Sequence, residues 1–265
     1  FLPLAHAYSC AFNFLVPMAV GAHVYLLGKV PSPKILLKAF EEVKPNLILT
    51  VPLILEKIYK KMILPQLSKT TMKVALNIPL LDSRIYAQIR KKLVDSFGGR
   101  FREVIVGGAA MNEEVTNFLY KIRFPFTIGY GMTECGPLIS YDHNDEYVPG
   151  SCGQILKGIM KVRIDSEDPY NKVGEIQVSG ENVMKGYYKN EEATAKVFTE
   201  DGWLRTGDLG TIDADNRIYI RGRSKTMILG ASGQNIYPEE IESKLNNLPF
   251  VMESIIIEKN GKLIG

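Results

Sequence analysis

Residues 126–134 combine groups that could bind a nucleotide, in the order Phe-Thr-Ile-Gly-Tyr-Gly-Met-Thr-Glu. The two glycines allow a sharp turn and the close approach of a ligand. Tyr130 offers a flat face to a planar ring. The hydroxyl of Thr133 can bond a phosphate oxygen, and Glu134 is a hard oxygen ligand for Mg²⁺. The stretch predicts half of a nucleotide-phosphate site; the alternative is a tight turn at a strand end with a solvated Thr-Glu pair.

Two later stretches carry polar groups that could bind other parts of a nucleotide. Residues 202–208 are Gly-Trp-Leu-Arg-Thr-Gly-Asp, and residues 221–225 are Arg-Gly-Arg-Ser-Lys. The carboxylate of Asp208 can accept hydrogen bonds from two vicinal ribose hydroxyls. The guanidinium of Arg223 is a fixed fork of donors suited to phosphate or ribose oxygens. A plain Gly-Asp turn is the structural alternative for Asp208.

The three motifs in this order resemble the adenylate-forming acyl-CoA synthetases, a superfamily that includes luciferases and the adenylation modules of peptide synthetases. The resemblance runs through nearly all 265 residues. The length between Lys57 and Gly107 and the phrase Phe-Gly-Gly-Arg-Phe at 97–101 are most similar to the long-chain fatty-acid–CoA ligases. The length of the acyl chain that is accepted depends on the depth of the pocket and cannot be deduced from sequence.

The resemblance implies an acid–thiol ligase. A carboxylic acid, expected to be a long-chain fatty acid, attacks ATP to give an acyl-adenylate and pyrophosphate, and coenzyme A then takes the acyl group and releases AMP. Positioning and charge stabilisation are the protein's part, with Mg²⁺ offsetting phosphate charge. The alternatives are an adenylation enzyme for an aryl, amino or short-chain acid or for a carrier-protein thiol, and a non-catalytic acyl-adenylate-binding module.

The resemblance also assigns individual roles. Thr133 and Glu134 are the expected catalytic residues, with Glu134 as the metal ligand. Lys225 falls at the family's hinge, and Gly233 would line the passage for the pantetheine arm. His6 would lie beside the acyl group, although a polar helix cap is the alternative and Ala5 stands where the family has an aromatic residue. The expected nucleotide-binding residues are Gly107, Gly108, Ala109, Gly129, Tyr130, Gly131, Met132, Thr133, Asp208 and Arg223.

The elements that must position these groups alternate between apolar strands and amphipathic helices in the first part of the chain. Strands are predicted at 21–27, 47–51, 104–106 and 126–128, and helices after Ser32, after Pro52, over 82–97 and after Asn112. This alternation favours a mostly parallel, helix-covered sheet, in an α/β fold. Ligands of such sheets bind at the carboxyl ends of the strands. We therefore expect the glycine turns at Gly107 and Gly129 to lie together.

From about Gly150 the pattern changes to short alternating runs separated by turn signals. It predicts a small antiparallel β subdomain. The resemblance implies that the start of an α+β C-terminal domain follows, and the residues there indicate a helix from Pro238. The expected divisions are 1–149, part of the N-terminal AMP-binding domain; 150–224, the β subdomain; and 225–265, the hinge and C-terminal domain. Asn260 and Gly261 form a typical hairpin turn pair.

Composition limits the partners and the compartment. The 32 basic and 29 acidic residues nearly balance, so nucleic acid is not indicated as a partner. The three cysteines are odd in number and far apart in sequence, which suits a reducing, cytoplasmic location. The apolar stretch 14–27 is too short to span a bilayer and is expected to be buried. Lys57, Lys60 and Lys61 are interpreted as a solvated helix face, with weak peripheral membrane association as the alternative. Oligomeric state is not indicated.

The two ends of the chain suggest an internal fragment. It opens within an apolar phrase at Phe1 without an initiator Met, and closes just after a hairpin turn. The family's phosphate loop is expected before Phe1, and its catalytic lysine beyond Gly265. The fragment alone is expected not to turn over appreciably.

Overall fold

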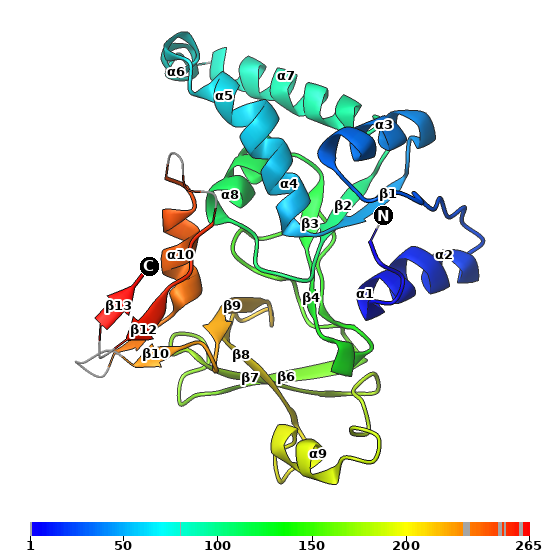
Figure 1. The fold of residues 1–265 in the computed structure, drawn as a ribbon, viewed down its shortest axis with the longest axis vertical. Helices are drawn as coiled ribbons and strands as arrows, with labels where there is room; N and C mark the ends of the chain where they lie inside the picture. The colour runs from blue at the N-terminus through cyan, green and yellow to red at the C-terminus, as the bar shows by residue number, and fades with distance from the viewer. Residues whose placement is uncertain (1, 80, 230–233, 249–250, 252, 260–261) are drawn as a thin grey trace. The chain divides into compact units, whose positions relative to one another are not determined.

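The chain divides into two compact units, which are described separately. Unit 1 comprises Phe1–Thr133 and Asp142–Pro149, and unit 2 comprises Glu134–Tyr141 and Gly150–Gly265. The predicted α/β class is confirmed, with a parallel sheet in unit 1 and antiparallel sheets in unit 2 (Figure 1). The predicted division at 224/225 stays a prediction. The computed structural model describes residues 2–79, 81–229, 234–248, 251, 253–259 and 262–265.

The parallel sheet of unit 1 has three strands in the order β1 (Leu47–Thr50), β2 (Glu103–Val106) and β3 (Phe126–Ile128). All three were predicted from their apolar runs. In the centre of the sheet, Val106 pairs with Ile128 of β3, and both are buried. Burial of both faces explains why these strands are continuously apolar and do not alternate.

Helices surround this sheet (Figure 1). Ser32 caps α3 (Pro33–Val43), as predicted, because its hydroxyl accepts a hydrogen bond from the backbone N–H of Ile35 at 3.4 Å. Helix α7 is followed by Gly98 and Gly99, whose φ angles of 92° and 72° favour glycine. The remaining elements of unit 1 are α1 (Ala7–Cys10), α2 (Val16–Ala19), α3 (Pro33–Val43), α4 (Pro52–Ile58), α5 (Leu64–Leu67), α6 (Thr70–Leu76), α7 (Leu81–Ser96), α8 (Glu113–Lys121), β4 (Tyr130–Gly131), and π-helical turns at Ala11–Leu15 and Tyr59–Ile63.

An aromatic cluster forms part of the core of unit 1. Phe97 is 1% exposed and stacks on Phe40 of α3, with 5.4 Å between ring centroids. Phe101 and Phe124 contact the same ring at 5.9 and 5.7 Å. The cluster therefore ties α3 and the end of α7 to the segments that enter β2 and β3.

Two predictions for the start of the chain are wrong. Residues 21–27 form no strand, and the apolar stretch 14–27 is largely exposed, including Val20 at 72% and Leu26 at 69%. An apolar run becomes a buried strand only where a neighbour pairs with it, and within the described residues no strand pairs with this one. The described part of the chain also holds no helix both long and apolar enough to cross a bilayer.

The lysines of the helix after Pro52 lie as predicted. Lys57, Lys60 and Lys61 are exposed, whereas Ile54 and Ile58 of the same helical segment are buried. The segment is therefore amphipathic, with the lysines on its solvated face.

Asn112 caps α8, and its removal gives a first testable prediction. Its side-chain oxygen accepts hydrogen bonds from the backbone N–H groups of Glu114 at 3.0 Å and Val115 at 3.3 Å. Asn112→Ala should lower the free energy of unfolding by about 1 kcal/mol, because those groups lose their partner. Asn112→Asp keeps the acceptor and is the matched control. Urea unfolding followed by circular dichroism measures both, and equal losses in the two variants would contradict the capping role.

The main sheet of unit 2 is antiparallel and confirms the predicted β subdomain. Its strands follow the order β6 (Met160–Asp165), β7 (Gly174–Gly180), β8 (Leu204–Ile212) and β9 (Ile218–Arg223). Asp208 lies within strand β8, so the alternative of a plain Gly207-Asp208 turn is wrong. The pairing of β8 with β7 shifts register opposite residues 206–208, and Gly207 there has a positive φ. The elements of unit 2 are β5 (Leu138–Ser140), β6 (Met160–Asp165), β7 (Gly174–Gly180), α9 (Glu191–Val197), β8 (Leu204–Ile212), β9 (Ile218–Arg223), β10 (Ile228–Leu229), β11 (Asn235–Ile236), α10 (Pro238–Leu245), β12 (Ile257–Lys259) and β13 (Lys262–Ile264).

The last two strands form the expected hairpin. Ile257 pairs with Ile264, and Lys259 pairs with Lys262, in antiparallel register. The predicted turn residues Asn260 and Gly261 lie outside the described residues. The helix predicted from Pro238 is α10.

Candidate functional site

The two glycine turns of unit 1 lie side by side, as predicted. Each glycine directly follows a strand, and its backbone N–H continues the ladder of the sheet. Gly107 donates to the carbonyl oxygen of Thr50 at 3.1 Å, and Gly129 donates to that of Val106 at 2.9 Å. Both turns therefore leave the carboxyl edge of one parallel sheet, where ligands of such sheets bind.

The turn after β2 is closely packed on one side and open on the other. A Cβ atom on Gly107 would lie 3.3 Å from Cζ of Tyr8, whose hydroxyl donates to the carbonyl oxygen of Ile105 at 3.2 Å. Burial raises the pKa of Tyr8 well above its ordinary value, so the hydroxyl stays protonated. Gly108 and Ala109 are exposed. Their backbone can be reached by a flat ligand, and their contact with adenine stays a prediction.

The residues after β3 differ in their exposure. Tyr130 is buried at 7% exposed, so its ring is part of the packing of unit 1. Gly131 and Thr133 are exposed and Met132 is half-buried. The hydroxyl of Thr133 is thus open to a phosphate oxygen, whereas the predicted stacking of Tyr130 on adenine would use a ring that already has protein neighbours. Neither role is tested by the structure.

Glu134 begins unit 2, within a 3₁₀ turn over Thr133–Cys135. Its carboxylate is half-buried, and its Oε1 accepts a hydrogen bond from the hydroxyl of Tyr187 at 2.9 Å. Partial burial raises the pKa of Tyr187, and so do the hydrogen bond and the charge of Glu134. Tyr187 therefore keeps its proton and acts as a donor. Sequence reasoning missed this residue, because 53 positions separate it from its partner.

Asp208 and Arg223 are brought together by the pairing of β8 with β9, in which they are directly opposite. Oδ1 of Asp208 lies 3.2 Å from Nε of Arg223. Asp208 is 6% exposed, whereas the side chain of Arg223 is 72% exposed. Thr206 fixes the backbone here: its Oγ1 accepts from the N–H of Asp208 at 3.1 Å and donates to the carbonyl of Ile176 at 2.8 Å. The carboxylate is thus held in place beside a movable cation.

Roles were also predicted for His6, Lys225 and Gly233. His6 is exposed and caps α1, with its Nδ1 accepting from the N–H of Tyr8 at 3.3 Å, so the polar-cap alternative describes what it does here. Its contact with an acyl group stays a prediction. Lys225 is exposed in the turn after β9. Gly233 lies outside the described residues.

Cys135 does not have the properties of a nucleophile. Its thiol is fully buried, and burial followed by the negative charge of Glu134 raises its pKa to about 12. A thiolate is therefore scarce at neutral pH.

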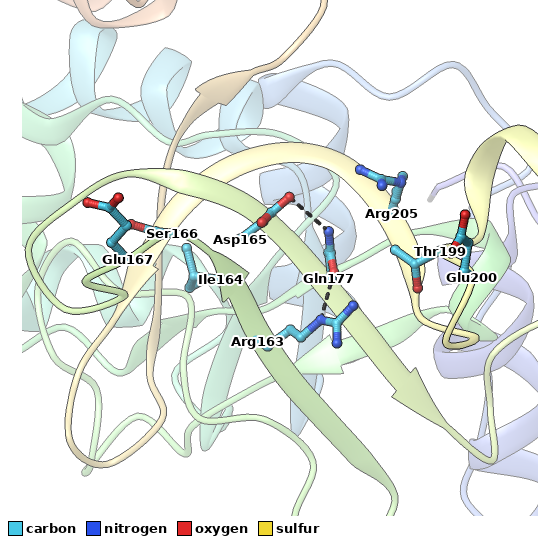
Figure 2. Close-up of a pocket in the computed structure, with 9 residues that line it drawn as sticks. All are labelled: Arg163, Ile164, Asp165, Ser166, Glu167, Gln177, Thr199, Glu200 and Arg205. Carbon is cyan, nitrogen blue, oxygen red and sulfur yellow. Dashed lines mark hydrogen bonds between the residues drawn. The ribbon is translucent and has the colours of Figure 1, made fainter.

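A pocket of about 750 Å³ lies on the main sheet of unit 2 (Figure 2). Figure 2 shows Gln177 between Arg163 and Asp165; Gln177 accepts from Nε of Arg163 at 2.7 Å and donates to Asp165 at 3.3 Å. The guanidinium of Arg163 also pairs with Asp201 and lies 4.6 Å from the centre of the Trp203 ring. These polar groups satisfy one another, and none of the predicted site residues lines the pocket.

Comparison with known proteins decides the family. Residues 1–188 match the family of AMP-binding enzymes. The chain belongs to this family. It is 27% identical to the long-chain-fatty-acid–CoA ligase ACSBG2 of Rattus norvegicus over 287 residues, covering all of this chain and 43% of the ligase. The chain therefore spans less than half the length of such curated relatives.

Solved structures agree with this assignment and with the fold. ATP-bound MatB from Rhodopseudomonas palustris is 27% identical, with a TM-score of 0.73, and the match covers 97% of this chain and 45% of MatB. O-succinylbenzoate coenzyme A synthetase (MenE) from Bacillus subtilis, in complex with ATP and magnesium, is 26% identical with a TM-score of 0.73, covering 98% and 48%. The recognition of an adenylate-forming acyl-CoA ligase family from sequence is confirmed.

The chemistry of Thr133 and Glu134 fits a magnesium ion carried by a nucleotide. Within the described residues no three His, Cys, Asp or Glu side chains gather to form a self-sufficient metal site. Magnesium typically keeps several waters and binds through one or two carboxylates together with substrate phosphates. The half-buried carboxylate of Glu134, directly after the open hydroxyl of Thr133, meets that requirement.

Proposed function

We propose that this chain is the nucleotide-binding part of a ligase that activates a fatty acid with ATP and transfers the acyl group to coenzyme A. The observation that carries the proposal is the pair formed by Asp208 and Arg223, which lie opposite each other on β8 and β9. Oδ1 of Asp208 is 3.2 Å from Nε of Arg223. A nearly buried carboxylate beside an exposed guanidinium suits a nucleotide, which offers donor hydroxyls on its ribose and acceptor oxygens on its phosphate.

Each group then has a defined task. Asp208 accepts from the ribose hydroxyls, and Arg223 can turn from Asp208 to a phosphate oxygen, because its side chain is 72% exposed. Thr133 donates to a phosphate oxygen, and the backbone of Gly107 to Ala109 packs against adenine. Glu134 holds a magnesium ion, which when bound offsets the charge of the phosphates. These residues position and stabilise charge and do not form a covalent bond to the acyl group.

Long-chain fatty acid is the proposed acid class. Its support is the identity of 27% to the rat long-chain-fatty-acid–CoA ligase. The second candidate is an aryl acid, which the similarity to an O-succinylbenzoate coenzyme A synthetase favours to about the same degree. We further propose a cytoplasmic location, which the free state of the three cysteines supports.

Nucleotide binding by Asp208 is tested by calorimetry with a non-reactive acyl-adenosine analogue. Asp208→Asn should weaken binding by about 10- to 100-fold, because hydrogen bonds to a charged group are worth about 1.5–3 kcal/mol. Asp215→Asn is the matched control, since this carboxylate is 67% exposed in a turn of the same sheet. Unchanged affinity in Asp208→Asn, or no binding by a chain that circular dichroism shows to be folded, would refute the site.

The acid class is tested with the same assay. Analogues carrying a long alkyl chain and an aryl acid are compared at equal nucleotide content, so that their difference reports the acyl group alone. A preference of tenfold or more for the alkyl analogue supports the fatty acid, and the reverse preference supports the aryl candidate.

A further inference from the structure

Only one oxygen of the Glu134 carboxylate has a hydrogen-bond partner among the residues that the structure describes. The hydroxyl of Tyr187 donates to Oε1 at 2.9 Å. Among the described residues this is the only hydrogen bond to the side chain of Glu134, and it forms no ion pair there. The second oxygen, Oε2, is thus left for a ligand from outside the chain.

The segment that carries Tyr187 is built against the turn that carries Glu134. The backbone N–H of Met184 donates to the carbonyl oxygen of Glu134 at 2.7 Å. The side-chain amide of Asn182 donates to the carbonyl oxygens of Cys135 at 2.7 Å and Leu138 at 2.8 Å. Together with the Tyr187 hydroxyl, four hydrogen bonds link residues 182–187 to residues 134–138.

Helix α9 holds Tyr187 from the other side. The backbone N–H of Tyr187 donates to Oγ1 of Thr194 at 2.9 Å, and that hydroxyl donates to the carbonyl oxygen of Asn190 at 2.8 Å. Gly186, just before Tyr187, has a φ of 148°, and a Cβ on it would lie 2.8 Å from Cγ2 of Thr194. Only a residue without a side chain lets the segment approach the helix this closely.

We propose that Tyr187 is a positioning residue for metal binding by Glu134. By occupying Oε1, it fixes the rotamer of the carboxylate and leaves it to bind the magnesium ion of ATP through the single oxygen Oε2. A ligand whose orientation is fixed in advance loses less freedom when the metal binds. This inference rests on the proposed role of Glu134 as a metal ligand.

The test measures the magnesium dependence of ATP binding, not turnover. Calorimetric titrations of the chain with ATP are repeated over a range of Mg²⁺ concentrations for the unmodified chain and for Tyr187→Phe. The variant should need about tenfold more Mg²⁺ for half of the metal-dependent gain in affinity, as is typical when a group that orients a metal ligand is removed. Its affinity for AMP without metal should be unchanged.

Tyr188→Phe is the matched control, because it removes the same hydroxyl from the neighbouring residue, which is 88% exposed. A second control is the double variant Glu134→Gln with Tyr187→Phe, which should show the same magnesium dependence as Glu134→Gln alone if Tyr187 acts through Glu134.

The outcomes distinguish the metal role of Glu134 from the positioning role of Tyr187. If the unmodified chain binds ATP without any effect of Mg²⁺, the proposed metal role of Glu134 is wrong. If magnesium strengthens binding but Tyr187→Phe behaves like Tyr188→Phe, only the positioning role is overturned. A further loss on adding Tyr187→Phe to Glu134→Gln would also overturn it, because Tyr187 would then act by another route.

Discussion

Phe97→Ala should lower the free energy of unfolding of unit 1 by about 3–5 kcal/mol, one of the two largest effects we expect from a single substitution. Phe97 is 1% exposed and its ring contacts those of Phe40, Phe101 and Phe124. Alanine removes the ring and leaves a cavity that the neighbouring rings fill only in part. Three contacts between aromatic rings are lost at the same time, and each of them stabilises the fold beyond the area that it buries.

Urea unfolding measures this loss with two probes. Far-ultraviolet circular dichroism follows the helices, most of which belong to unit 1, while the fluorescence of Trp203, the single tryptophan, follows unit 2. Phe97→Leu retains an apolar side chain and should lose clearly less than Phe97→Ala. A loss below about 1 kcal/mol in Phe97→Ala would contradict the structure of the core.

The phrase Phe-Gly-Gly-Arg-Phe at 97–101 has a packing role that its resemblance to the long-chain ligases did not indicate. From sequence it indicated the long-chain branch of the ligases. In the structure both phenylalanines pack in the core, and Gly98 has no room for a Cβ beside the carbonyl oxygen of Phe40. The phrase is therefore explained by packing within unit 1. The class of acid that the resemblance indicated stays a prediction.

Local signals were sufficient wherever one short segment determines its own conformation. Ser32 and Asn112 cap their helices because a side-chain oxygen reaches N–H groups two or three residues ahead. The strand at 47–50 and its partners were apparent from continuous apolar runs. Paired strands also explain why the turns at Gly107 and Gly129 could be expected to lie together.

Sequence patterns failed to predict the conformation or the contacts of a residue where these depend on a partner distant in sequence. The run at 21–27 has the composition of a strand, yet no described strand pairs with it. Asp208 follows a glycine as in a turn, but its pairing with Arg223 across β8 and β9 keeps it in a strand. The same reason hides Tyr187: nothing near it in sequence shows that its hydroxyl meets Glu134.

The second large effect concerns Glu134. Glu134→Gln keeps the size of the side chain and an oxygen that can still accept from the Tyr187 hydroxyl, so the turn over Thr133–Cys135 should stay folded. What it removes is the negative charge that we propose binds the magnesium ion of ATP. In a ligase of full family length that carries this chain, the rate of adenylation should fall by about 10²–10³-fold, the range found when one group that stabilises developing charge is removed.

Exchange of pyrophosphate into ATP in the presence of the acid measures that step without coenzyme A. Glu181→Gln, which removes an exposed carboxylate from the same unit, is the matched control and should keep the full rate. A rate for Glu134→Gln within about threefold of the unmodified enzyme would contradict the metal role. A large loss accompanied by an equal loss of folding stability would assign Glu134 to structure instead, because the hydrogen bond to Tyr187 would then matter more than the charge.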